Sequence, residues 1–186
     1  MRATQPTSTS RPSQASEATK GLGRKAIPPS RIPRELTTEE VEELVEVFAN
    51  AALRAKKAGF DAIEIHGTHG YLIAQFLSPL TNRRTDRYGA DRILFALEIV
   101  QRIKELCGKD YPVIFRLCAD EFLNGGITIS YAKQIAKRLV DAGVDAFDVT
   151  GGNYDTIDII IPSYYCTDSE GWFFKLAKEI KKEVEV

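Results

Sequence analysis

The hydrophobic and polar positions of this chain follow a helical period in some segments and form short apolar runs in others. From Val41 to Ala55, apolar side chains recur every three or four positions, which predicts an amphipathic helix. Thr37 and Glu40 have the spacing of a capping box and predict the start of this helix, and Gly59 predicts its end. Residues 61–65 (DAIEI) follow directly and are predicted to form a short strand.

The same helix–strand unit recurs along the chain. Helices are predicted at 93–106 and 131–140, strands at 112–117 and 145–149, and a last helix from a Ser169 cap to about residue 180. Alternation of this kind indicates parallel strands joined by helical crossovers, and therefore an α/β fold. The pattern alone does not separate an open, doubly wound sheet from a closed barrel. The motif G-x-G-x-x-G follows none of the strands, which argues weakly against a dinucleotide-binding Rossmann fold.

The number of predicted strands is small for a closed α/β architecture. A barrel of eight strand–helix units needs roughly 250 residues, whereas this chain has 186. We therefore expect a middle segment of something longer. Residues 1–36 are rich in Ser, Thr, Pro and basic residues and are expected to form an irregular arm, and residues 37–186 a partial α/β domain.

Composition excludes several classes of function. The chain is 44% hydrophobic and 27% charged, with a formal net charge of −1, as in ordinary soluble globular proteins. This charge gives no reason to expect nucleic acid or a membrane surface as a partner. The sequence has neither an apolar run of about 20 residues nor a signal-peptide core, and its three cysteines match no disulfide or metal-binding spacing. We expect a cytoplasmic protein without a bound metal.

The segment most informative about chemistry lies at the expected end of the first strand. It reads His66-Gly-Thr-His69-Gly-Tyr71 and contains both histidines of the chain. Ligand sites of parallel α/β folds lie at the carboxyl ends of the strands. Glycines there let the backbone turn sharply and let a ligand approach closely.

This segment and its continuation, EIHGTHGYLIAQFLSPLTNRRTDRYG, resemble the signature of the Old Yellow Enzyme family. The family includes ene-reductases, enoate reductases and 2,4-dienoyl-CoA reductases. The resemblance extends from PRELTTEE, near residue 33, to the last helix. One departure from the family is a shorter run at residues 88–95, YGADRILF.

The resemblance implies a TIM (β/α)8 barrel that binds FMN above the carboxyl ends of its strands, with NADH or NADPH as reductant. Residues 37–186 would then be a partial FMN-binding barrel domain that contains strands four to six, with barrel segments missing on both sides. Arg116 matches the arginine that contacts the flavin ring near N1 and O2, where a fixed cation stabilises the reduced flavin. The implied substrate is a small molecule with an activated C=C bond, such as an α,β-unsaturated carbonyl compound.

The residue types suit this chemistry. Hydride addition to an activated C=C bond builds negative charge on the activating oxygen, and N–H donors from His66 and His69 would stabilise that charge. The neighbouring carbon then needs a proton. Tyr71 is the candidate donor because a phenol is protonated near neutral pH and can act as a general acid.

Other interpretations remain open for each of these residues. The two histidines could bind a metal, although no third ligand lies close in sequence, and this would make the chain part of a metal-dependent hydrolase. Tyr71 could be a packing residue, and Arg116 could pair with Asp120 or Asp148. The whole chain could also be a non-enzymatic remnant or an interaction module.

Two neighbouring loops receive supporting functions. The polar loop at residues 82–86 (NRRTD) is expected to act as scaffold or lid. Residues 150–152 (TGG) end the third strand, where backbone contact with a ligand and a simple tight turn are both possible.

Overall fold

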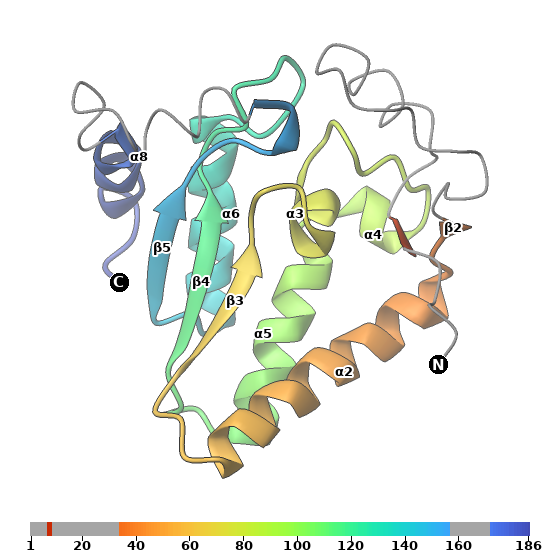
Figure 1. Ribbon diagram of the computed structural model, residues 1–186, viewed down its shortest axis with the longest axis vertical. Coiled ribbons are helices and arrows are strands. Elements are labelled where there is room, and N and C mark those ends of the chain that lie inside the picture. The colour runs from red at the N-terminus through yellow and green to blue at the C-terminus, as the bar shows by residue number, and fades with distance from the viewer. Residues whose placement is uncertain (1–6, 9–33, 157–171) are drawn as a thin grey trace.

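The fold is an α/β unit built on a parallel sheet (Figure 1). The computed structural model describes residues 7–8, 34–156 and 172–186. Strands β3 (Ile63–Gly67), β4 (Val113–Cys118) and β5 (Ala146–Thr150) pair in parallel in the order β3-β4-β5. The predicted α/β class and parallel pairing are thus confirmed. The position of these strands within a complete barrel stays a prediction.

The four long helices of the fold were expected from the sequence. They are α2 (Thr38–Lys57), α5 (Leu94–Cys107), α6 (Ile129–Ala142) and α8 (Trp172–Lys181). The capping box of α2 is confirmed, because the Thr37 side chain accepts from the Glu40 amide and the Glu40 side chain accepts from the Thr37 amide. Ser169, the predicted cap of the last helix, lies outside the described residues.

Two short helices in the loop after β3 were not predicted. These are α3 (Leu72–Leu77) and α4 (Arg87–Ala90). In α3 most side chains are buried, so its six residues carry no polar face from which a helical period could be recognised. Asp86 caps α4 by accepting from the amides of Tyr88 and Gly89.

The core lies between the sheet and its helices. Helix α2 packs on α5, α5 on α6, and α8 on the outer strand β5; α6 lies behind β4 and β5 in Figure 1. An aromatic cluster joins α3 to α5, with the rings of Phe76 and Phe95 4.3 Å apart and Tyr88 packed edge-on against both. This cluster fixes α3, the helix that follows the candidate motif, against the body of the fold.

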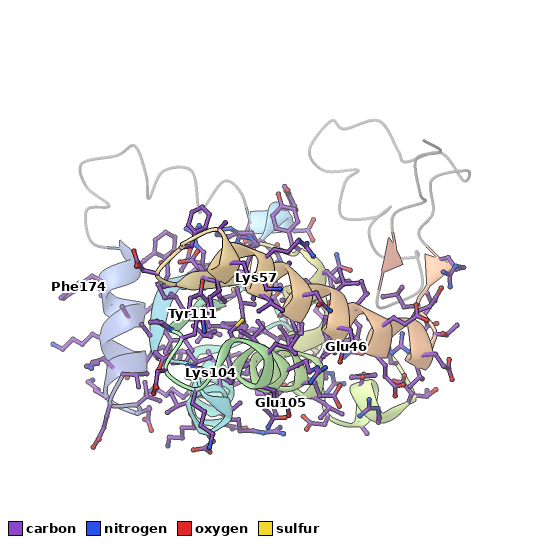
Figure 2. All side chains as sticks on the ribbon, turned by 90° about the horizontal axis from the view of Figure 1, so that it is seen from below. Glu46, Lys57, Lys104, Glu105, Tyr111 and Phe174 are labelled. Carbon is purple, nitrogen blue, oxygen red and sulfur yellow. The ribbon has the colours of Figure 1, made fainter. Side chains whose placement is uncertain are left out.

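Hydrogen bonds made by Lys104 and Asp145 connect the loops at the amino ends of the strands. Lys104 donates to the carbonyls of Lys109 and Tyr111 and, at 2.6 Å, to the carboxylate of Asp145, which also accepts from the Val113 amide. Figure 2 shows Lys104 and Tyr111 on the face seen from this end, and Phe174 pointing outward from α8. These residues lie at the end of the sheet opposite the candidate site.

Part of the predicted amino-terminal arm is in contact with this body. Strand β1 (Thr7–Ser8) pairs in parallel with β2 (Arg34–Glu35), and Leu36 is buried in the core. Residues 1–6 and 9–33 lie outside the described residues. In the described ranges 34–156 and 172–186, no helix is both long and apolar enough to cross a membrane.

Candidate active site

His66 lies within strand β3, which corrects the prediction that the strand ends at residue 65. It pairs in register with Arg116 of β4, which pairs in turn with Asp148 of β5. Residues in register share a face of the sheet, whereas sequence neighbours point to opposite faces. Ile65 and Phe115 are accordingly buried, and the polar row is only partly buried. The sheet thus presents an imidazole, a guanidinium and a carboxylate side by side.

A tight turn carries the chain from β3 to α3. His69 has a φ of 58° and Gly70 a φ of 74°, so two consecutive residues adopt the left-handed conformation. This conformation is uncommon for a residue with a side chain, and such residues cluster at functional sites. The turn brings His69 Nε2 to 3.3 Å from Thr150 Oγ1, at the end of β5.

Tyr71 is the residue before the first turn of α3, and its side chain is half-exposed. Its ring lies 5.2 Å from the ring of His66, and the two imidazole rings are 5.5 Å apart. The three predicted side chains therefore gather at the carboxyl end of β3. The Tyr71 hydroxyl also makes a short hydrogen bond with the hydroxyl of Tyr154, which the sequence analysis did not single out.

Both histidines are held toward the neutral form. Burial lowers the pKa of His66 below its usual value, and the positive charge of Arg116 lowers it further. The pKa of His69 is lowered by burial, then by Arg116 and His66. A neutral imidazole keeps one N–H donor, which can bond to a substrate oxygen.

Arg116 forms an ion pair with Asp148, which decides between the two acidic partners considered. Its Nε lies 2.9 Å from Asp148 Oδ2, but the N–H does not point at this oxygen, and Nε has no aligned hydrogen-bond partner. Asp120 instead accepts from the amide of Phe122. The ion pair therefore leaves Arg116 with donor capacity for another acceptor.

Two further buried polar atoms near this row lack an aligned partner among the described residues. They are His66 Nε2 and Thr68 Oγ1. Burial and then the charge of Glu121 raise the pKa of the Cys118 thiol to about 12, and Thr68, which is fully buried beside it, opposes this. Buried polar groups are normally satisfied. His66 Nε2 and Arg116 Nε lie on the polar row and suit a ligand with a polar, hydrogen-bonding edge, as the pyrimidine edge of a flavin has.

A buried carboxylate holds the loops around the site. Glu121, only 2% exposed, accepts from Ser78 Oγ at 2.6 Å, from the Ile127 amide at 2.7 Å and from Asn153 Nδ2 at 3.2 Å. These donors come from the loops after β3, β4 and β5. Sequence reasoning missed Glu121 and Tyr154, and it considered Asp148 only as a possible ion-pair partner of Arg116. Their one shared signal was their position in or just after a predicted strand.

The polar loop at residues 82–86 is held against the rest of the fold by hydrogen bonds from its side chains. Asn82 is buried and donates to the carbonyls of Phe76 and Tyr88. Arg84 binds both carboxylate oxygens of Asp86 and donates to the Leu36 carbonyl. These contacts describe a scaffold, and a lid function for the loop stays a prediction.

The described residues also bear on the metal interpretation. They contain no group of three or more His, Cys, Asp or Glu side chains that could hold a metal ion. Cys107 and Cys118 are buried free thiols, and Cys166 lies outside the described part. The arrangement provides neutral imidazoles, a cation and a phenol, which can stabilise developing negative charge and deliver a proton.

A family model, two relatives and a solved structure with similar sequences all indicate flavin-dependent oxidoreductases or their homologues. A model of the NADH:flavin oxidoreductase / NADH oxidase family matches residues 2–185. The NADH oxidase of Thermoanaerobacter brockii is 52% identical over 158 residues, which is 83% of this chain and 24% of that protein. The cinnamate reductase of Clostridium sporogenes is 40% identical over 192 aligned residues, covering 89% of this chain and 29% of that protein.

Among solved structures, an Old Yellow Enzyme homologue from Zymomonas mobilis aligns with a TM-score of 0.59 at 29% identity. The alignment covers 68% of this chain and 36% of that one. The chain thus spans between about a quarter and somewhat more than a third of the proteins it matches here.

Proposed function

The chain belongs to the NADH:flavin oxidoreductase / NADH oxidase family, and from this premise we propose that it is the catalytic segment of an ene-reductase. Membership implies FMN as the cofactor and NADH or NADPH as the reductant. The proposed reaction is the reduction of a C=C bond next to a carbonyl or similar activating group. The relative named cinnamate reductase supports this class, because cinnamate has a C=C bond next to a carboxylate.

One observation carries the proposal: the rings of His66, His69 and Tyr71 gather at the carboxyl end of β3. A substrate oxygen within reach of both imidazoles would bring its C=C bond close to the Tyr71 phenol. The depressed pKa of each histidine favours the neutral form near pH 7, which still has one N–H to donate to that oxygen.

Arg116 is the proposed flavin contact. Its guanidinium, held beside Asp148, would bind the polar edge of the isoalloxazine, and FMN when bound supplies the hydride. Residues of this chain carry out the other steps. His66 and His69 donate hydrogen bonds to the activating oxygen as it gains negative charge. Tyr71 then transfers its hydroxyl proton to the carbon next to the activating group.

The test is a chimeric holoenzyme in which this chain replaces the matching stretch of the Thermoanaerobacter brockii NADH oxidase. Stopped-flow absorbance follows flavin reduction by NADH and, separately, flavin reoxidation by 2-cyclohexenone or cinnamaldehyde. We expect the enone to reoxidise the flavin with formation of the saturated product. Reoxidation by oxygen alone, with the enone recovered unchanged, would show that the chain does not support this reaction.

A further inference from the structure

Tyr154 places a second phenol against the proposed proton donor. Its hydroxyl is hydrogen-bonded to that of Tyr71, and the two rings meet edge to face with centroids 5.6 Å apart. Tyr154 begins the 3-10 turn η3 (Tyr154–Thr156), just after β5 and 83 residues from Tyr71 in sequence. Two strand-end loops therefore contribute the pair.

The turn that carries Tyr154 is anchored by buried groups. Asn153 is 7% exposed; its side chain donates to Glu121 and accepts from the Asp155 amide at 2.8 Å. Thr156 is 3% exposed, and its hydroxyl accepts from the Asn153 amide at 2.9 Å. These bonds on either side of Tyr154 fix the direction in which its ring leaves the turn.

The loop that carries Tyr71 packs directly against this turn. A Cβ at Gly70 would lie 3.7 Å from Asn153 Cβ and from Cδ2 of the Tyr154 ring, which is ordinary van der Waals distance, so the loop and the turn are neighbours. His69 adds its contact with Thr150. With the hydroxyl pair, these contacts hold the two phenols in one arrangement.

We propose that Tyr154 is a positioning residue for proton transfer, donating its hydroxyl hydrogen bond to Tyr71 as Tyr71 loses its proton. The inference rests on the proposed function of Tyr71. In the step, the Tyr71 O–H bond breaks and a C–H bond forms on the substrate carbon, which leaves a phenolate on Tyr71. The Tyr154 O–H stabilises this phenolate, then passes its proton to it and takes a new proton from water.

Exposure and chemistry support this order. Both residues are about half-exposed, so water can reach the pair. A hydrogen bond to a charged oxygen is roughly twice as strong as one to a neutral oxygen. The Tyr154 bond therefore strengthens during the transfer and lowers its barrier, which a bond of constant strength would not do.

The experiment is a double-mutant cycle with Tyr71→Phe, Tyr154→Phe and the double variant in the chimeric holoenzyme, with Tyr131→Phe as the matched control on α6. We expect Tyr154→Phe to slow flavin reoxidation by 2-cyclohexenone about 10- to 100-fold, as for loss of a hydrogen bond to a charged group. Flavin reduction by NADH and flavin content should not change. The solvent deuterium isotope effect on reoxidation should rise, and Tyr131→Phe should behave as the parent.

In the Tyr71→Phe background, Tyr154→Phe should cause no further loss, because its effect passes through the Tyr71 hydroxyl. Multiplying losses in the double variant would overturn the inference, as would an unchanged Tyr154→Phe enzyme or equal slowing of both half-reactions. If Tyr71→Phe itself does not slow reoxidation, the proposed function of Tyr71 fails. If it does and Tyr154→Phe does not, only the present inference fails.

Discussion

His66 and Arg116 lie directly opposite each other on neighbouring parallel strands, β3 and β4. The guanidinium charge next to the imidazole lowers the pKa of His66 beyond the effect of burial. The same pairing places the proposed substrate-binding group beside the proposed flavin-binding group. A single register relationship therefore sets the position of the histidine relative to the proposed cofactor contact and adds to the effect of burial on its pKa.

Removing either imidazole should weaken binding of a ligand that carries a phenol or enone oxygen. We expect His66→Ala and His69→Ala to cost about 1 to 3 kcal/mol each, as for a hydrogen bond to a partly charged group. Titration of the long-wavelength charge-transfer band with p-hydroxybenzaldehyde in the chimeric holoenzyme measures this. The Gln variants, which keep a donor, should lose less. Unchanged affinity in both alanine variants would remove the histidines from this function.

Tyr71→Phe should slow the oxidative half-reaction and leave the reductive half-reaction nearly unchanged. Flavin reoxidation by an enone should slow about 10²- to 10⁴-fold, the usual contribution of a general acid, while reduction by NADH stays near the parent rate. Stopped-flow absorbance reports both rates, and Tyr131→Phe serves as the matched control. Equal slowing of the two halves would indicate that Tyr71 has a packing function.

Stability of this chain should fall as the pH is lowered through the range just below 6.5, the usual pKa of histidine. Because the folded pKa values of His66 and His69 are depressed, the unfolded chain takes up protons at higher pH than the folded one. The contribution of the two depressed histidine pKa values to the free energy of unfolding is therefore complete above pH 6.5 and is lost as the pH falls. The pKa of Asp86, held at about 2 by Arg84, adds a loss that begins only below about pH 4.

Urea unfolding midpoints between pH 7.5 and 4.5 test this pH dependence. The chain has only two histidines, so a His66→Gln/His69→Gln double variant should abolish most of the slope between pH 6.5 and 5. If the double variant keeps the full slope, other groups cause it.

Glu121→Ala should destabilise the fold more than an average surface substitution. It removes a buried acceptor from Ser78, Asn153 and the Ile127 amide, and leaving such donors unsatisfied costs about 2 to 3 kcal/mol. Glu121→Gln keeps one acceptor oxygen and should be milder. Thermal unfolding of the three proteins measures the difference. Equal melting temperatures for all three would show that the network contributes little.

Local patterns in the sequence predicted the four long helices and the three strands of the sheet, but not α3, α4 or the β1–β2 pair. Helix α2 was predicted from its apolar stripe and its capping box, because both depend on residues three or four positions apart in one segment. Parallel pairing followed from the alternation of elements. The spacing of His66, His69 and Tyr71 pointed to one site because the three side chains belong to a single turn.

Only the tertiary structure decided which side chains meet across the strand ends. The contact of Tyr71 with Tyr154, the choice of Asp148 over Asp120 for Arg116, and the bonds of Glu121 to Ser78 and Asn153 all join residues far apart in sequence. Such contacts depend on strand register and on the paths of the crossover helices. A shift of one residue in register would move each side chain to the opposite face of the sheet, and local hydrophobic patterns do not specify the partner across it.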